Sequence, residues 1–310
     1  MIKASIVTTV LNEEGTIEKF IQALLNQSVK PDEIVICDGG STDSTVEKVK
    51  KLIKDGALIK LITKPGNRSI GRNAAIKESR NSVIAVTDGG TVADRNWFNE
   101  IIKPFEDSSV MAVAGFFESK PETFFERIYS TMLTQSPEEI DPENWLPSAR
   151  SIAFRREVWE KAGGYPEYTR YNEDTPFDIA VKKSSYKFVF APKAVVYWRP
   201  RSNLIEFFKQ YHNYAIGDGL DLISWQAYLK KFSIYIFGLG LFILSFWFKY
   251  LFVIFFLGLI LFFLKRDLRV AGKIPKIETI ILAPILTVTY DLAEFSGYLK
   301  GIYESKFKKD

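Results

Sequence analysis

Residues 34–44 have the sequence Ile-Val-Ile-Cys-Asp-Gly-Gly-Ser-Thr-Asp-Ser, in which an apolar, β-branched run ends at an acidic residue, two glycines and a polar cluster. The apolar run has the composition of a buried strand, and the polar cluster is typical of a turn that leads into a helix. Similar apolar runs occur elsewhere in the first half of the chain. Together, the predicted strands are Ser5–Val10, Glu33–Cys37, Ala57–Ile62 and Val83–Thr87.

Segments with helical spacing of apolar residues separate these strands. They are Thr16–Asn26, Ser44–Lys54 and Ile70–Ser79. Repeated strand–helix–strand units favour a parallel sheet with helices on both faces, so we expect an α/β domain. The strand signals become less regular after residue 110. They cover Val110–Phe116, Ser151–Phe154, Lys187–Phe190 and Ala194–Tyr197.

Composition excludes several classes of protein. Of the 310 residues, 47% are hydrophobic and 25% are charged, which is enough apolar material for a folded core and excludes a disordered chain. The 41 Lys and Arg residues lie among 37 Asp and Glu residues without a basic stripe, so nucleic-acid binding is not expected. The single cysteine, Cys37, lies in an apolar run and fits a buried thiol in a cytosolic domain. The segment after Met1 is strand-like, which predicts no secretory signal peptide.

Residues 232–264 contain one charge, Lys249, and are otherwise apolar and aromatic. One straight helix over this range would be roughly 50 Å long, against a hydrocarbon core of about 30 Å. We therefore predict a transmembrane helical hairpin that turns at Lys249, with Trp247 and Tyr250 at the far interface. Basic residues flank the hairpin on the side that would face the cytosol: Lys230, Lys231, Lys265, Arg266, Arg269 and Lys273.

Two segments beside the hairpin have open interpretations. Residues 203–214 form an amphipathic helix that either packs on its own domain or lies in the lipid interface. Thr279–Tyr290 is uncharged and is re-entrant, interfacial or a short span. The predicted organisation is an α/β domain (1–200), amphipathic interfacial helices (201–231), a transmembrane hairpin (232–264), and a basic loop, third membrane-associated segment and cytosolic tail (265–310).

Polar residues follow the first two strands where each strand ends. Asn12 and Glu13 follow the first strand, and Asp38 follows the second. In an open α/β sheet, the ligand crevice lies at these ends. Asp38 could accept hydrogen bonds from a base or ribose, and the two glycines after it let a backbone approach closely. The alternative is that residues 41–44 form only a turn and a helix cap, with Asp43 or Ser44 as the capping residue.

Two arginines and an aspartate follow later in the domain. Arg68 and Arg72 lie where a strand joins a helix, and either could neutralise a diphosphate or could simply be solvated. Asp88 lies at the end of the fourth strand, where a carboxylate could hold a divalent cation that bridges phosphate oxygens.

These motifs, taken in order, resemble those of inverting family 2 glycosyltransferases of the GT-A fold, over about residues 4–215. The matching pieces are Asn12-Glu13-Glu14, Asp38-Gly39-Gly40-Ser41-Thr42-Asp43, Arg72-Asn73, Asp88, Ala162-Gly163-Gly164-Tyr165 and Asn172-Glu173-Asp174. The resemblance implies a mixed, mainly parallel sheet flanked by helices.

The resemblance also implies roles for individual residues. Asp174 would be the catalytic base, with Glu173 orienting it or binding the sugar, and Asp88 would bind Mg²⁺ or Mn²⁺ at the diphosphate. A nucleotide-sugar donor is expected, UDP-linked before GDP-linked. The implied donor-binding residues are Val10, Asn12, Glu13, Asp38, Gly39, Gly40, Arg72, Asp88 and Gly89.

Two departures from the family pattern qualify these roles. The usual DxD motif is replaced by Asp88-Gly89-Gly90, so Asp88 binds metal alone, shares it with a group such as Asp94, or leaves the charge to an arginine. The Gln-x-x-Arg-Trp motif of processive synthases is matched only at Gln210, which disfavours a processive synthase.

The segment around Gln210 carries the predicted acceptor or interface residues. These are Gln210, Tyr211 and His212, the one histidine of the chain, for which a structural role competes with an acid–base or metal role. Together with Gly217-Asp218-Gly219, this segment is similar to membrane-attached, ExoA-type exopolysaccharide transferases.

The expected function is that of a multi-pass enzyme of the cell membrane with its catalytic domain facing the cytoplasm. It would transfer sugar to a lipid-linked or other membrane-located glycan acceptor in cell-surface glycan synthesis. Asp174 could instead be a helix N-cap ahead of Pro176. A non-catalytic scaffold binding nucleotide or glycan is one alternative. A nucleotidyltransferase is another, but it lacks a glycine-rich basic loop because the acidic Glu13 and Glu14 occupy that turn.

Overall fold

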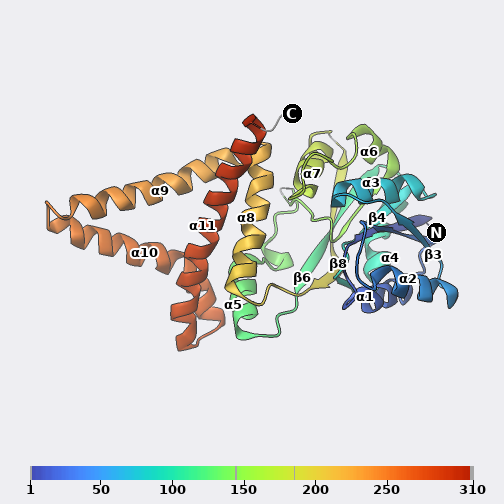
Figure 1. Cartoon of the computed structure of the whole chain (residues 1–310), viewed down its shortest axis with the longest axis horizontal. Helices are drawn as coiled ribbons and strands as arrows, with labels where there is room; N and C mark the ends of the chain where they lie inside the picture. The colour runs from blue at the N-terminus through green and yellow to red at the C-terminus, as the bar shows by residue number, and fades with distance from the viewer. Residues whose placement is uncertain (1, 144, 185, 308–310) are drawn as a thin grey trace. The chain divides into compact units, whose positions relative to one another are not determined.

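The computed structural model describes residues 2–143, 145–184 and 186–307 (Figure 1). Its contacts divide the chain into two compact units. The first comprises Met1–Lys120 and Gln135–Arg199, and the second comprises Pro121–Thr134 and Pro200–Asp310. The second unit thus includes a segment that lies within the predicted domain 1–200. The end of the predicted tail, residues 308–310, lies outside the described residues.

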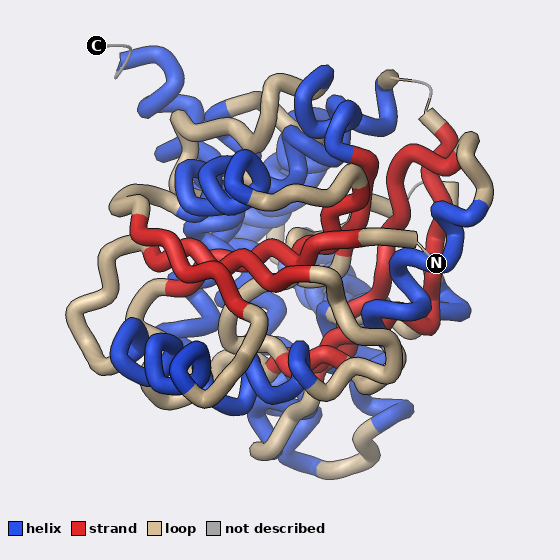
Figure 2. Tube along the Cα trace, turned by 90° about the vertical axis from the view of Figure 1, so that its right-hand side faces the viewer, coloured by secondary structure: helices blue, strands red, loops and turns tan. Residues whose placement is uncertain are grey.

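The first unit is built on one eight-stranded sheet, whose strands are red in Figure 2, in the order β3-β2-β1-β4-β7-β6-β8-β5. The first four strands along the chain are parallel and close to those predicted: β1 (Ala4–Val10), β2 (Glu33–Asp38), β3 (Ile59–Thr63) and β4 (Val83–Val86). The others are β5 (Val92–Ala93), β6 (Val110–Ser119), β7 (Ile152–Arg155) and β8 (Lys187–Trp198).

The antiparallel strand β7 lies between β4 and β6, which makes the sheet mixed. Two predicted strands, Lys187–Phe190 and Ala194–Tyr197, proved to be the single strand β8. Its pairing with β6 is irregular between Ala114 and Phe116, which explains why its sequence pattern is interrupted.

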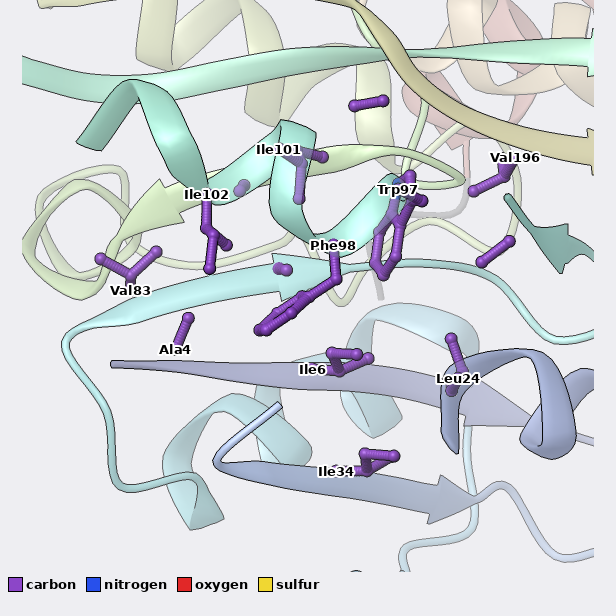
Figure 3. Packing of buried hydrophobic residues seen from close by; sticks show 14 of the residues in the cluster. Ala4, Ile6, Leu24, Ile34, Val83, Trp97, Phe98, Ile101, Ile102 and Val196 are labelled. Atoms are coloured by element: carbon purple, nitrogen blue, oxygen red, sulfur yellow. The ribbon is translucent and has the colours of Figure 1, made fainter. Parts of the chain in front are cut away.

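Helices pack on the sheet because each carries an apolar face toward it. They are α1 (Ile17–Leu25), α2 (Thr45–Lys54), α3 (Arg68–Glu78), α4 (Trp97–Ile102), α6 (Arg156–Lys161) and α7 (Asp174–Lys183), with short 3₁₀ turns η1 (Lys103–Glu106) and η2 (Pro137–Glu139). In one core, Trp97 and Phe98 of α4 pack over Ile6 and Ile34 (Figure 3). Cys37 is buried in the other core, where burial raises its pKa to about 11.

The second unit is helical. Its elements are α5 (Phe124–Leu133), α8 (Leu204–Leu220), α9 (Trp225–Leu244), α10 (Tyr250–Lys273) and α11 (Ile277–Phe307). The helices α9 and α10 form a hairpin with Lys249 immediately before α10 (Figure 1). By length and composition, two helices among the described residues could cross a membrane: α9, with a mean hydropathy of 1.5, and α11, with 1.3. The predicted segment Thr279–Tyr290 is part of α11.

The helices α8 and α11 touch through their backbones. A Cβ atom on Gly297 would lie 2.1 Å from the carbonyl oxygen of His212, and one on Gly301 would lie 2.2 Å from that of Ile216. Only glycine fits such a crossing. On the apolar face of the helix predicted over 203–214, Phe207 of α8 is fully buried against Tyr129 of α5, while Leu204 is exposed. Packing of Phe207 within its own unit is compatible with both interpretations of this helix.

Candidate active site

The loops after β1 and β2 are joined by a set of hydrogen bonds. The two strands are parallel neighbours, which brings their carboxyl ends together. Backbone and side chains then pair across the gap: Asn12 N to Ser41 Oγ (2.9 Å), Thr42 N to Asn12 Oδ1 (2.9 Å), Glu13 N to Thr45 Oγ1 (2.8 Å) and Glu14 N to Asp43 Oδ2 (3.1 Å). Asn12 has a left-handed backbone (φ 55°). The two clusters predicted to bind nucleotide therefore form one structure.

Asp38 holds the glycine turn that follows it. The buried carboxylate accepts hydrogen bonds from the backbone N–H groups of Gly40 (3.0 Å) and Ser41 (3.1 Å). Gly40 has φ 99°, which favours glycine. Of the two predicted capping residues, Ser44 is the N-cap of α2 without a capping side-chain hydrogen bond, and Asp43 Oδ1 accepts from Thr45 N at 3.0 Å. Ser44 instead donates its hydroxyl to Glu14.

Glycines let this turn and the loop after β4 approach strand β1. Gly39 N donates to the carbonyl of Val10 at 2.9 Å, and Val10 itself is buried in the core. A Cβ on Gly89 would lie 3.1 Å from the carbonyl oxygen of Thr9. Val10, Gly39 and Gly89 thus bring the loops after β1, β2 and β4 into close contact.

Arg72 occupies a position that the sequence did not predict. Its side chain is 1% exposed, its Nη2 donates to Asp88 Oδ1 at 2.9 Å, and its Nη1 donates to Glu173 Oε1 at 3.1 Å. The guanidinium also stacks 4.6 Å from the ring centroid of Tyr165. Both Nη atoms of Arg72 are thus engaged by protein, and a role of this residue in neutralising a diphosphate stays a prediction. Arg68, at the start of α3, is exposed.

Asn73, the next residue of α3, anchors the segment around Gly163 and Gly164. Its Oδ1 accepts from Trp159 Nε1 and Tyr165 N, each at 2.9 Å, and its Nδ2 donates to the carbonyl of Tyr165 at 2.9 Å. Gly164 has φ 81°, and a Cβ there would lie 3.1 Å from Asn73 Oδ1. These contacts explain why motifs so far apart in the sequence share one site.

Glu173 and Asp174 lie at the start of α7. The helix cap is Glu173, and Asp174 is the first helical residue, so the reading of Asp174 as an N-cap is wrong. Asp174 Oδ2 accepts from Ser148 Oγ (3.2 Å) and Ala149 N (3.1 Å). In the part of the chain that the structure describes, no hydrogen-bond donor contacts Asp174 Oδ1, so this atom is available to an acceptor.

Charge and burial shift the pKa values of two carboxyl groups of the site in opposite directions. Although burial opposes it, the guanidinium of Arg72, with help from Arg68 and Arg150, lowers the pKa of Asp88. Burial raises the pKa of Glu173, and Asp174 and Asp88 add to this, while Arg72 opposes it. Perturbed carboxyl groups around one buried cation are typical of functional sites.

Sequence reasoning missed three contributors to this site. Ser148 and Ala149 position Asp174 from an irregular stretch that carries no pattern. Asp178 is 1% exposed, and burial raises its pKa well above the usual value, with Asp174 adding to the effect. Its spacing of four residues from Asp174 on a helix was the one available signal.

Few side chains of the site could act as ligands of a divalent cation. Among the described residues, no group of three or more His, Cys, Asp and Glu side chains is arranged to hold a metal ion. Asp94 is engaged by Tyr197 OH (3.3 Å) and Asn96 N (2.9 Å). Asp88 is 27% exposed, and within the described residues its Oδ2 has no hydrogen-bond donor. A Cβ on Gly90 would lie 3.4 Å from Glu13 Oε2, so this carboxylate faces the same loop. Oxygen ligands of this kind fit Mg²⁺ or Mn²⁺.

The predicted acceptor residues lie on α8, in the second unit. Gln210 Nε2 donates to Tyr214 OH at 3.1 Å, and Tyr211 OH donates to Tyr129 OH at 3.0 Å. His212 Nδ1 is 2.9 Å from Ser296 Oγ. Burial, together with Lys300, lowers the pKa of His212. All three side chains have partners within their own unit.

The mixed sheet flanked by helices has the GT-A type of fold. Residues 5–174 match the sequence family described as "Glycosyl transferase family 2", which is more than half of the chain. The chain belongs to this family, and it is a family 2 glycosyltransferase. These matches favour the enzyme over the scaffold and the nucleotidyltransferase.

Several proteins are similar to this chain. Succinoglycan biosynthesis protein ExoA of Rhizobium meliloti is 27% identical over 72% of this chain and 71% of its own length. O-antigen chain rhamnosyltransferase RfbN of Salmonella typhimurium is 24% identical, covering 63% of this chain and 65% of its own length. Glycosyltransferase AglE of Haloferax volcanii is 25% identical over 97% of both chains. Two of these names, those of ExoA and RfbN, refer to succinoglycan and to the O-antigen chain.

A solved structure shares the fold. The mannosyltransferase PcManGT from Pyrobaculum calidifontis, in complex with GDP-Man and Mn²⁺, superposes with a TM-score of 0.58. It is 15% identical in sequence, and the superposition covers 99% of this chain and 88% of the mannosyltransferase.

Proposed function

We propose that this protein is a membrane-attached, inverting glycosyltransferase. It would move a sugar from a nucleotide-diphosphate sugar to a lipid-linked or membrane-located acceptor in cell-surface glycan synthesis. The observation that carries the proposal is the link between Asp88 and Glu173 through Arg72, with Asp174 beside it. It joins a predicted donor-binding carboxylate to the residue that precedes the predicted base, within the first unit.

Asp174 is the proposed general base. A hydroxyl acceptor attacks the anomeric carbon from the face opposite the nucleoside diphosphate, its proton passes to Asp174 Oδ1, and the diphosphate departs with the bonding electron pair. Ser148 and Ala149 hold Oδ2 and therefore fix the orientation of Oδ1. An ionised phosphate acceptor would need no base.

The donor would lie across the loops after β1, β2 and β4. Asp38, with Gly39 and Gly40, presents the turn for the nucleoside. A divalent cation, when bound, would neutralise charge on the leaving diphosphate, and Asp88 with Glu13 would hold it. Arg68 is the exposed arginine we assign to the diphosphate. We propose UDP-sugars as the first donors to test, followed by GDP-mannose, which the structural neighbour contains.

The α9–α10 hairpin is the proposed membrane anchor. Apolar side chains are exposed along both helices, among them Phe237 (69%) and Leu261 (65%), and at the turn between them, where Trp247 is 73% exposed. At its base, Asp291 pairs with Arg266 and with Lys231, the latter at 3.2 Å. Exposed apolar helices of this kind fit a lipid environment. We propose that the enzyme is multi-pass in the cell membrane and that its catalytic domain faces the cytoplasm.

The test is donor hydrolysis and transfer by the detergent-purified full chain. UDP- and GDP-sugars are supplied with Mg²⁺, Mn²⁺ or EDTA, and with a lipid-linked hydroxyl or a polyprenyl phosphate acceptor. Asp174→Asn should lower transfer to a hydroxyl by about 10²–10⁴-fold. The matched control, Asp55→Asn, removes an exposed carboxylate. The base assignment is wrong if Asp174→Asn retains full transfer to a hydroxyl. Absence of nucleotide binding and of turnover in the native chain would refute the function.

A further inference from the structure

Arg72 is a buried cation that contacts two carboxylates of the candidate site. Its side chain is fully buried, although an arginine is rarely so. The partners of its Nη atoms are Asp88 at the end of β4 and Glu173 at the start of α7. Its Nε is also buried and has no hydrogen-bond partner among the described residues. Burying a guanidinium with one unsatisfied N–H donor costs folding free energy. Packing alone therefore does not explain an arginine at this position.

The guanidinium fixes the geometry between its two carboxylates. It is planar, permanently charged, and presents its N–H groups in a rigid fork. One face of the fork stacks on Tyr165, whose backbone is bonded on both sides to Asn73. Asn73 and Arg72 are adjacent on α3. Rotation of the fork is therefore opposed from both its own helix and the facing segment.

We propose that Arg72 is a positioning residue that couples the donor side of the site to the acceptor side. By holding Asp88 Oδ1, it directs Oδ2 toward the metal and diphosphate, and by holding Glu173 it fixes the start of α7, from which Asp174 projects. This inference rests on the proposed function. It goes beyond the neutralisation of a diphosphate that the sequence suggested for this residue.

The coupling follows from the excess of acidic groups around one cation. Asp88, Glu173 and Asp174 all interact with Arg72. If one carboxylate loses its charge, the guanidinium pairs more strongly with those that remain. Neutralising Glu173 should therefore draw Arg72 toward Asp88 and weaken a metal ion at Asp88, although Glu173 itself touches no metal.

The experiment measures Mn²⁺ affinity in the presence of UDP or GDP, by electron paramagnetic resonance of free Mn²⁺, on the full chain in detergent. Glu173→Gln and Arg72→Lys should each weaken Mn²⁺ binding by about 10-fold, as mutations of groups that orient metal ligands commonly do. Lysine keeps the charge but cannot bridge two carboxylates. Arg80→Met, at an exposed arginine that pairs with Glu33, is the control. Steady-state kinetics should show a lower kcat with a donor KM changed much less.

Three results would overturn the proposal. One is Mn²⁺ affinity in Glu173→Gln equal to that of the native chain. Another is Arg72→Lys with native affinity and kcat. The third is a loss confined to donor KM, as a direct phosphate ligand would give. Glu173→Gln keeps the side-chain shape, so it provides the test if the Arg72 variants do not fold. Failure of the proposed function looks different, because the native chain would then bind neither nucleotide nor Mn²⁺.

Discussion

Glu13 reaches the space beside Gly90. A Cβ on Gly90 would lie 3.4 Å from Glu13 Oε2 and 3.5 Å from Oε1. Gly90 stands where the DxD motif would have its second aspartate, and a carboxylate from another loop lies next to that position. Gly90 also has φ 79°, a conformation that aspartate adopts less readily than glycine. The missing carboxylate of the motif therefore has a candidate replacement.

Glu13→Gln should weaken Mn²⁺ binding in the presence of nucleotide by about 10-fold, because it removes a negatively charged oxygen ligand while keeping the shape. Titration calorimetry with Mn²⁺ measures the change. Glu18→Gln, at an exposed glutamate on α1, should bind as the native chain does. Equal affinities in the native chain and Glu13→Gln would show that Asp88 acts without Glu13.

Asp178 predicts a pH dependence of stability. Burial raises its pKa in the folded chain, and Asp174 adds to this, while Arg72 and Lys182 oppose it. A raised folded-state pKa gives stability that is present below the unfolded value, near 4, and is lost as the pH rises through the folded value. Asp178→Asn removes this loss. Its Tm relative to the native chain should therefore be higher at pH 8 than at pH 5.

Thermal denaturation in detergent at the two pH values measures this difference, expected to be about 2–4 °C. Asp55→Asn, at an exposed carboxylate, should show no such pH dependence. If the Tm difference between Asp178→Asn and the native chain shrinks or reverses toward pH 8, Asp178 is ionised in the folded chain and stabilised by a cationic partner.

Substitution by alanine should have different effects at Gly297, where α8 and α11 cross, and at Gly272, which lies on α10. Gly297→Ala would place a Cβ 2.1 Å from the carbonyl oxygen of His212, and the two helices would have to separate. Such overpacking should lower the free energy of unfolding by about 1–3 kcal/mol. Gly272→Ala, on α10 with no atom within 4 Å of the new Cβ, should be neutral or stabilising.

Denaturation midpoints of the two variants provide the comparison. Equal midpoints for Gly297→Ala and the native chain would show that the helices are not in backbone contact.

Membrane topology can be tested at the tip of the hairpin. Cys37 is the chain's single cysteine, so Cys37→Ser gives a background without thiols. Adding Lys249→Cys places one thiol between α9 and α10. If the hairpin crosses the membrane, an impermeant maleimide should label this thiol from outside intact cells, while Lys54→Cys, in the catalytic domain, should react only after lysis. Labelling of both only after lysis would indicate a hairpin that enters the membrane without crossing it.

Much of the fold could be predicted because its signals are local. The β-branched runs of β1, β2 and β4 mark buried strands, and the polar turns after β1 and β2 mark the crevice. The break in apolar character at Lys249 similarly marks the turn between α9 and α10. The order of the motifs was enough to indicate the family, which the comparison confirmed.

The sequence by itself determined the class of enzyme and the composition of its candidate site, because both follow from residue types in a fixed order. Tertiary structure decided the position of Arg72, the packing of α5 within the second unit and the close crossing at Gly297. Each of these depends on partners distant in the chain: Asp88 and Glu173 meet Arg72 only after α3, β4 and α7 pack together. Local pattern records which faces are apolar, but the choice of partners for a buried charge or a glycine is made when the elements assemble.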